Sequence, residues 1–268
     1  MEILHVSAEC FPAAKVGGLG DVVGALPKYQ NNMGVTSKVV IPYYVNSFTR
    51  KSDLDRVYKA HIKMGDLHYD FEVLQARSNP DFPLYLIRIP GLLDRSEVYS
   101  YEDDVVRFLA FQIATLDWVL TLKKKPALVH CHDHHTGLIP FMMSNATKYA
   151  KLREIPTVLT IHNAQYQGQF GYEKLRYFPD FNLERMGLLD WNNSINPLAT
   201  GIKCAWRVTT VSPSYLEELK KGASGLESLI RKEGAKFFGI LNGIDTSIWN
   251  PEKDAYITQN YSDKTTES

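Results

Sequence analysis

Residues 130–135 form the densest group of titratable side chains in the chain. They read His-Cys-His-Asp-His-His and follow an apolar run at residues 127–130 that predicts a short buried strand. Imidazole and carboxylate groups exchange protons in catalysis and bind transition metals. This histidine stretch is therefore a candidate functional site.

Two other interpretations of the histidine stretch remain open. Asp133-His134-His135 matches the short signature of a class of metal-dependent phosphoesterases, whose metal site needs further carboxylates from other strand ends. The first two predicted strands end in Ser-Ala-Glu at residues 7–9 and in Pro-Tyr at residues 42–43, which offers few such groups. Alternatively, Asp133 has a purely structural role as the cap of a helix.

A second stretch, residues 13–24, combines a lysine with closely spaced glycines. It lies between an apolar run at residues 3–6 and a segment with helical spacing of apolar residues. Glycines lack a Cβ, so backbone N–H groups and the positive end of the helix can approach a phosphate, and Lys15 adds a positive charge. The spacing from Gly18 to Gly24 fits neither the dinucleotide-binding fingerprint nor a Walker loop. A tight turn with a surface lysine is the alternative.

The elements that must position these residues alternate between strands and helices. Strand-like runs occupy residues 3–6, 38–41, 57–64, 67–76, 84–89, 127–130, 157–161, 207–211 and 237–241. Residues 102–123 have the pattern of a long amphipathic helix, and Pro27 predicts a kink or an early end in the first helix. The two-residue connection at residues 65–66 predicts an antiparallel hairpin appended to the main sheet. The alternation predicts an α/β fold with a Rossmann-like, doubly wound parallel sheet covered on both faces.

Ligands of open parallel sheets bind beyond the carboxyl ends of the strands. This rule selects four stretches, at residues 15–21, 130–135, 162–168 and 210–213. In the last of them, Ser212 is predicted to cap a helix that begins at Pro213. We expect Lys15, in the first stretch, to face the groove that contains Asp133 of the second stretch and His162 of the third.

The composition argues against several classes of protein. The chain has 268 residues, 44% of them apolar, and its 30 basic and 30 acidic side chains leave no net charge to attract nucleic acid or an anionic membrane. We find neither the pattern of a signal peptide nor an apolar run long enough to cross a membrane. The three cysteines, Cys10, Cys131 and Cys204, are far apart and odd in number, which favours reduced thiols and a cytoplasmic location.

The motifs, taken in order, resemble those of bacterial glycogen synthases and plant starch synthases. The glycine stretch resembles the signature that opens these enzymes, and residues 162–168 match their His-Asn-x-x-Tyr-Gln-Gly motif. Residues 210–215 and 241–245 match later signatures. The family pattern at the histidine stretch is His-x-His-Asp-Trp-His, and this chain departs from it with His134 in place of the tryptophan. Several ordered motifs over nearly the whole chain are far more specific than any single one.

The resemblance implies a glycosyltransferase of the GT-B fold, in which two Rossmann-like domains enclose the active site. It implies retaining transfer of glucose from a nucleotide sugar, ADP-glucose or UDP-glucose, to the non-reducing end of an α-1,4-glucan. No metal and no other cofactor is expected. The expected partners are the nucleotide sugar, the glucan and a C-terminal domain of the same enzyme, with no nucleic acid and no membrane.

The resemblance also implies which residues bind the donor. Lys15 and the backbone at Gly17 and Gly18 would contact the donor near its phosphates and sugar. His162 would contact the donor glucose, with Asn163 beside it. A histidine that only completes the hydrogen bonds of its own strand end remains the structural alternative for His162.

Three further residues are implied on the acceptor side. Asp133 and Tyr99 would lie near the acceptor, and Asp21 would organise the glycine loop or touch the acceptor. Together with His162, the two aspartates are the residues that we expect to act in catalysis.

The sequence predicts one domain at residues 1–245 followed by a linker or tail at residues 246–268. In the family that the chain resembles, a second domain supplies the basic residues that clamp the diphosphate, and we expect that domain to be absent from this chain. The chain alone is therefore expected to fold and to be nearly inactive. A catalytically silent sugar- or nucleotide-binding module of the same fold is the alternative function.

Overall fold

The computed structural model describes residues 1–77 and 81–265. Its strands are β1 (Glu2–Val6), β2 (Thr36–Pro42), β3 (Leu54–Met64), β4 (Leu67–Ala76), β5 (Leu84–Arg88), β6 (Leu128–His132), β7 (Thr157–Ile161), β8 (Arg207–Thr210) and β9 (Phe237–Gly239). Its α-helices are α1 (Gly18–Asn32), α2 (Ser47–Lys51), α3 (Asp104–Thr121), α4 (Ile139–Asn145), α5 (Met186–Leu189), α6 (Pro197–Cys204), α7 (Pro213–Leu219) and α8 (Glu227–Lys232).

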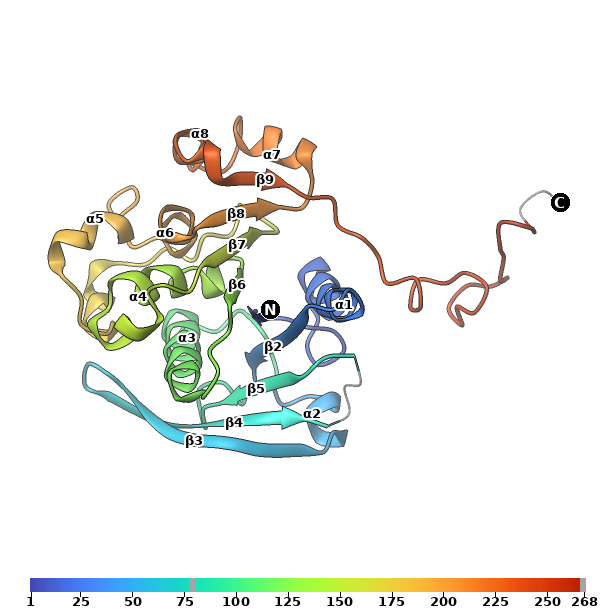
Figure 1. Ribbon diagram of the computed structural model, residues 1–268, viewed down its shortest axis with the longest axis horizontal. Helices are drawn as coiled ribbons and strands as arrows, with labels where there is room; N and C mark the ends of the chain where they lie inside the picture. Colours follow the sequence, from blue (N-terminus) through green and yellow to red (C-terminus); the bar gives the residue numbers. More distant parts are fainter. Residues whose placement is uncertain (78–80, 266–268) are drawn as a thin grey trace.

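The strands of the described residues form one sheet in the order β3-β4-β5-β2-β1-β6-β7-β8-β9 (Figure 1). All neighbours from β5 to β9 along this order are parallel, whereas β4 is antiparallel to both β3 and β5. The predicted hairpin is thus confirmed as β3 and β4, at one edge of the sheet. From the central strand β1, the chain builds first toward β2 and later toward β6. The topological switch point, where ligands of such sheets bind, therefore lies beside β1 and β6.

Helices cover both faces of the sheet, as the alternating pattern predicts. On β2, Val39 and Ile41 pack in one apolar cluster with Val23 of α1, whereas Val40 packs in the other cluster with Leu109 of α3. Successive side chains of a strand point to opposite faces, so the two clusters lie on the two sides of the sheet. Figure 1 shows α1 and α2 on one side, and α3 and α4 on the other.

Pro27 does not end the first helix, and the prediction of an early end is wrong. α1 continues through Pro27 to Asn32. A proline lacks the N–H that would bind the carbonyl four residues earlier, which here is the carbonyl of Val23. The thiol of Cys10 donates a hydrogen bond to this oxygen, with an S–O distance of 3.6 Å. The thiol therefore partly replaces the missing hydrogen bond of the helix.

Some strand ends differ from the predicted ones by one or two residues. β6 continues to His132 instead of ending at His130, because Cys131 still pairs with β1 and His132 still pairs with β7. His130 and His132 are consequently strand residues, and the loop begins at Asp133. β8 ends at Thr210 and β9 at Gly239, so residues 240 and 241 follow the last strand.

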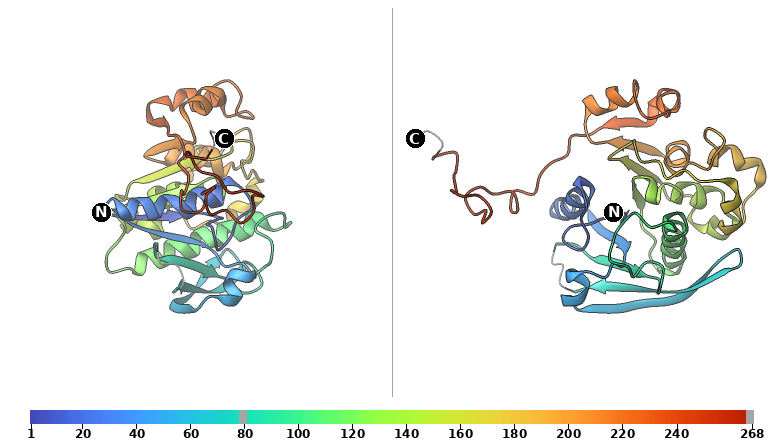
Figure 2. Two further views of the ribbon diagram at one scale, coloured as in Figure 1. Left: turned by 90° about the vertical axis from the view of Figure 1, so that its right-hand side faces the viewer. Right: turned by 180° about the vertical axis from the view of Figure 1, so that it is seen from behind.

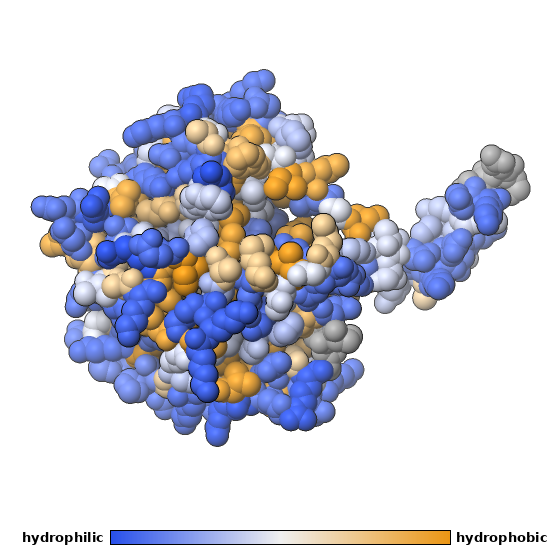
Figure 3. Space-filling model, in the orientation of Figure 1, coloured by the Kyte–Doolittle hydropathy of each residue, from blue (hydrophilic) through white to orange (hydrophobic). Residues whose placement is uncertain are grey.

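In the described part of the chain after β9, residues 240–265 contain no helix or strand and extend away from the sheet (Figure 2). At the start of this tail, Asp245 forms an ion pair with Lys28 of α1, with an O–N distance of 2.9 Å. Several apolar side chains here are exposed, among them Leu241 and Trp249, and Figure 3 shows apolar surface where the tail leaves the body. No helix among the described residues is both long and apolar enough to cross a bilayer.

Candidate functional site

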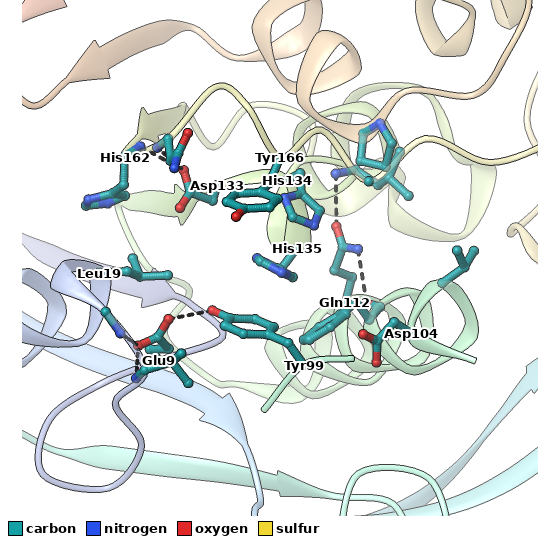
Figure 4. Close-up of a pocket in the computed structure, with 18 of the residues that line it drawn as sticks. Glu9, Leu19, Tyr99, Asp104, Gln112, Asp133, His134, His135, His162 and Tyr166 are labelled. Carbon is teal, nitrogen blue, oxygen red and sulfur yellow. Dashed lines mark hydrogen bonds between the residues drawn. The ribbon is translucent and has the colours of Figure 1, made fainter. Parts of the chain in front are cut away.

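A cavity of about 800 Å³ opens at the switch point of the sheet. Segments that follow β1, β6, β7 and β8 all contribute to its lining, together with α3. Figure 4 shows Asp133, His162 and Tyr166 along one wall, and Leu19 and Tyr99 along the opposite wall. The cavity therefore lies at the edge of the sheet that was selected by the rule that ligands bind beyond parallel strand ends.

The cavity brings together six of the eight predicted site residues. They are Gly17, Gly18, Tyr99, Asp133, His162 and Asn163. The other two, Lys15 and Asp21, do not belong to the lining, so the expectation that Lys15 faces the groove with Asp133 and His162 is not met in this structure. They form an ion pair with each other, with an N–O distance of 2.7 Å, and their side chains are 40% and 37% exposed.

Asp133 joins the loops that follow β6 and β7. Its Oδ1 accepts hydrogen bonds from the backbone N–H groups of His162, at 2.7 Å, and Asn163, at 3.4 Å. Its side chain forms no helix-cap hydrogen bond, so the capping role considered for it is wrong. Burial raises the pKa of its carboxyl group to about 7, although the two backbone donors act in the opposite direction. The loop position is unusual as well, since Asp133 has a φ of 56°.

Glu9 plays a comparable part on the opposite wall, and the sequence analysis did not select it. Its Oε2 accepts hydrogen bonds from the backbone N–H groups of Val16, at 2.5 Å, and Gly17, at 3.0 Å. Its Oε1 accepts a hydrogen bond from the hydroxyl group of Tyr99 at 2.6 Å. Glu9 follows β1 after two residues and is 3% exposed. The strand-end rule, applied to the first strand, would have found it.

The glycine loop presents the positive end of a helix to the cavity. α1 begins at Gly18, with Gly17 as its N-cap and no side chain that caps it. The N–H of Gly17 is bonded to Glu9, so the first N–H groups of the helix, at Gly18 and Leu19, remain for an anion. Both residues line the cavity. The N–H groups that could bind a phosphate, as predicted for this stretch, therefore belong to the first turn of α1 and not to the loop before it.

His134, which replaces the tryptophan of the family pattern, packs against Gly168. A Cβ on Gly168 would lie 2.4 Å from Cδ2 of His134, and Gly168 has a φ of 71°, so no other residue fits here without strain. The rings of His134 and His135 lie 3.7 Å apart, and the Nδ1 atoms of both are buried without a hydrogen-bond partner among the described residues. Burial lowers the pKa of His134 to about 4 and that of His135 well below its usual value.

Asp133, His134 and His135 do not form a metal site in the described part of the chain. The only histidine, cysteine or carboxylate group with suitable spacing there consists of His5 and two strand residues of β6, and it contains no carboxylate. One carboxyl oxygen of Asp133, Oδ1, accepts hydrogen bonds from two backbone N–H groups instead. The phosphoesterase interpretation therefore has no support in the geometry.

The fourth predicted stretch positions a helix at the edge of the cavity. Ser212 caps α7, as predicted, because its hydroxyl oxygen accepts a hydrogen bond from the N–H of Tyr215 at 3.0 Å. The hydroxyl oxygen of Tyr215 in turn accepts a hydrogen bond from the backbone N–H of Ala164, in the loop after β7, at 3.2 Å. From this stretch, Val211 reaches the lining of the cavity.

Comparison with known proteins gives consistent results along the chain. Residues 2–232 match the family described as the starch synthase catalytic domain. The chain is 54% identical over 263 residues to a glycogen synthase of Flavobacterium johnsoniae, which covers 98% of this chain and 56% of that protein. It is 38% identical over 268 residues to a glycogen synthase of Streptococcus agalactiae, with the same two shares. The chain thus spans about half the length of the curated relatives that it matches.

A solved structure resembles the whole fold. It is the catalytic domain of starch synthase IV from Arabidopsis thaliana bound to ADP and acarbose. The TM-score is 0.87 at 30% sequence identity, and the match covers 98% of this chain and 55% of that one.

Proposed function

This chain belongs to the starch synthase catalytic domain family, as its motifs predicted, and from this premise we propose its reaction. We propose that it forms the acceptor-side half of a retaining glucosyltransferase. The enzyme moves glucose from ADP-glucose to the non-reducing end of an α-1,4-glucan. The ADP and acarbose bound to the Arabidopsis relative support an adenine nucleotide donor and an oligosaccharide acceptor.

One observation carries this proposal: residues that follow three separate strands converge on a single cavity at the switch point. His162 and Asn163 follow β7, Asp133 follows β6, and Gly18 follows β1, yet all four line the same space. A transferase must hold a donor and an acceptor in line, and a cavity with walls from several loops can contact both.

The donor diphosphate is proposed to lie at the start of α1. The N–H groups of Gly18 and Leu19, with the helix dipole, stabilise the charge that develops on the leaving diphosphate. Lys15 must leave Asp21 to add its charge there. An exposed ion pair is worth about 1 kcal/mol or less, so a diphosphate competes easily for the ammonium group.

His162 is proposed to contact the donor glucose from the opposite wall. Its backbone N–H is fixed by the Asp133 carboxylate, and burial lowers the pKa of its imidazole to about 4, so the ring is neutral near pH 7. A neutral imidazole can exchange hydrogen bonds with sugar hydroxyl groups without adding charge to the site. Tyr99 and Asp133 are proposed to face the glucan, and Asp21 to hold the loop until the donor binds.

The test is glucose transfer to glycogen by a fusion protein. Residues 1–245 of this chain replace the matching part of the Flavobacterium johnsoniae enzyme, and incorporation of labelled glucose is measured with ADP-glucose and with UDP-glucose. We expect transfer from ADP-glucose and a decrease of about 100-fold for His162→Ala, because a contact to the reacting sugar is lost. The chain alone should transfer almost no glucose. A folded fusion that uses neither donor contradicts the proposed function, and strong activity of the chain alone contradicts the need for a second half.

A further inference from the structure

Three histidines, of which His5 and His132 are buried and His162 is half-buried, form a row of hydrogen bonds that leads from the cavity into the sheet. Nε2 of His162 lies 3.1 Å from Nδ1 of His132 on β6. Nε2 of His132 lies 3.0 Å from Nδ1 of His5 on β1. The row ends on α1, where Nε2 of His5 lies 2.8 Å from the amide oxygen of Gln30. The sequence analysis selected His132 only as a member of the histidine stretch, and it did not select His5 or Gln30.

All three imidazoles of this row are neutral at ordinary pH. Burial lowers the pKa of His5 to about 4, against the opposing effect of Gln30, and lowers that of His162 to about 4. Burial and the neighbouring imidazoles lower the pKa of His132 well below its usual value. A neutral imidazole has one N–H donor and one acceptor nitrogen. In an uninterrupted row, all rings must therefore donate in the same direction.

Gln30 determines that direction. Its Oε1 also accepts a hydrogen bond from the hydroxyl group of Ser37 at 2.7 Å, so a single oxygen has two donors. A carbonyl oxygen cannot donate, which requires the proton of His5 to be on Nε2. The Nδ1 atom of His5 then accepts from Nε2 of His132, and Nδ1 of His132 accepts from Nε2 of His162.

We propose that Gln30, His5 and His132 are positioning residues that hold His162 in its Nε2–H tautomer. The other ring nitrogen of His162, Nδ1, is thereby kept as a hydrogen-bond acceptor for a hydroxyl group of a ligand in the cavity. Only the identity of that ligand as a sugar rests on the proposed function. The hydrogen bond of each ring nitrogen sets the tautomer of the next, as a partner does for any histidine with a defined role.

A metal ion is the competing explanation for these histidines. Ligand nitrogens of His5, His130 and His132 lie within 4.8 Å of one another. However, Nδ1 of His5 and Nε2 of His132 point at each other at hydrogen-bond distance, and Nε2 of His130 lies 2.6 Å from Oγ1 of Thr160. A metal ion would have to break both contacts. The rings of His130 and His132 are also stacked, 4.4 Å apart, so their nitrogens lie in nearly parallel planes.

The test is the nitrogen NMR spectrum of histidine side chains in the ¹⁵N-labelled chain. We expect the Nε2 signal of His162 to be of the protonated type and its Nδ1 signal of the unprotonated type. Gln30→Glu keeps an acceptor oxygen and should leave both signals in place. Gln30→Leu removes the anchor, so both directions of the row become populated, and about half of the His162 rings should have the proton on Nδ1. Gln30 lies on α1 outside the cavity lining.

His130 provides the matched control because its ring stacks on the row without taking part in it. His130→Phe should leave the His162 signals unchanged, whereas His132→Phe should shift them. Protonated Nδ1 on His162 in the wild-type chain would overturn the proposal, as would unchanged signals in Gln30→Leu. Stoichiometric metal bound to the purified chain would overturn it too. These spectra do not depend on glucose transfer, so a negative result here leaves the proposed reaction to its own test.

Discussion

Each wall of the cavity has a carboxyl group that accepts hydrogen bonds from the backbone, and the two groups differ in the number and length of these bonds. On the wall that carries the glycine loop, the glycine wall, Glu9 accepts hydrogen bonds from two consecutive backbone N–H groups. On the wall that carries Asp133 and His162, the histidine wall, Asp133 does the same. Glu9 uses both of its oxygens and has a third donor, the hydroxyl group of Tyr99. The donors of Asp133 share one oxygen, and one of the two distances is 3.4 Å.

The weaker hydrogen bonding of Asp133 affects how its wall responds to pH. Hydrogen bonds favour the charged form of a carboxylate and burial disfavours it. For Asp133 burial is the larger effect, which raises the pKa to about 7. The histidine wall is thus held by an acid that exchanges its proton near neutral pH. Variants of each wall can break or sharpen this contrast.

Glu9→Ala should have the largest effect on stability. It leaves two backbone N–H groups and the Tyr99 hydroxyl without their acceptor, which predicts a loss of about 3–5 kcal/mol in the free energy of unfolding. Urea denaturation measures this loss. Glu154→Ala, at an exposed position, is the control and should change stability little. A loss below about 1 kcal/mol would mean that Glu9 does not hold the wall.

Asp133→Asn should remove a pH dependence. Below about pH 4 the folded and unfolded chains both keep the proton of Asp133, and its contribution to stability is then highest. As the pH rises toward the folded value of about 7, the unfolded chain releases the proton first, so stability falls by up to about 4 kcal/mol. Thermal unfolding from pH 4 to 8 compares the two chains. Parallel curves for wild type and variant would contradict the raised pKa.

Tyr99→Phe should have a smaller effect that belongs to the glycine wall alone. Loss of one hydrogen bond to a carboxylate predicts a decrease of about 1–2 kcal/mol in the free energy of unfolding. Tyr166→Phe is the matched control, because Tyr166 lines the same cavity and is 61% exposed. In a double-mutant cycle, Tyr99→Phe should cost nothing once Glu9 is alanine. Additive losses would show that the two side chains act independently.

Lys15→Ala should have the smallest effect on stability. Its ion pair with Asp21 is exposed, so the predicted loss is below about 1 kcal/mol. Binding of ADP to the chain, measured by calorimetry, should weaken nonetheless, because the ammonium group is proposed to move to the diphosphate. Asp21→Asn frees Lys15 and should bind ADP at least as tightly as wild type. Equal affinity in wild type and Lys15→Ala would remove Lys15 from the donor site.

The sequence predicted the elements and the edge of the sheet because periodicity and strand-end position are local signals. The hairpin, the long helix, the cap at Ser212 and the parallel core were all predicted from such patterns. Asp133, His162 and Asn163 were placed in one cavity for the same reason, since they follow β6 and β7 directly. Pro27 misled the prediction because the thiol that compensates it lies outside the helix.

The remaining features depend on contacts between distant segments, which no local pattern encodes. Glu9 precedes Tyr99 by 90 residues, and His5 precedes His132 by 127 residues. Whether Lys15 faces Asp21 or the cavity depends on its side-chain rotamer, which a sequence motif does not determine. The partner of a buried polar atom, which sets its proton or its tautomer, becomes known only when the sheet brings β1 and β6 together.

The rate at which the thiol of Cys10 is labelled should report how often the glycine loop opens. Reciprocal backbone hydrogen bonds between Cys10 and Ala14 close the base of the loop, and the side chain is fully buried beneath it. A thiol reagent can modify Cys10 only in molecules whose loop has swung open, so labelling kinetics count those excursions. Cys131 is fully buried in β6, so its labelling rate in the same sample reports global unfolding. A single labelling time course thus distinguishes local opening of the glycine loop from unfolding of the whole sheet.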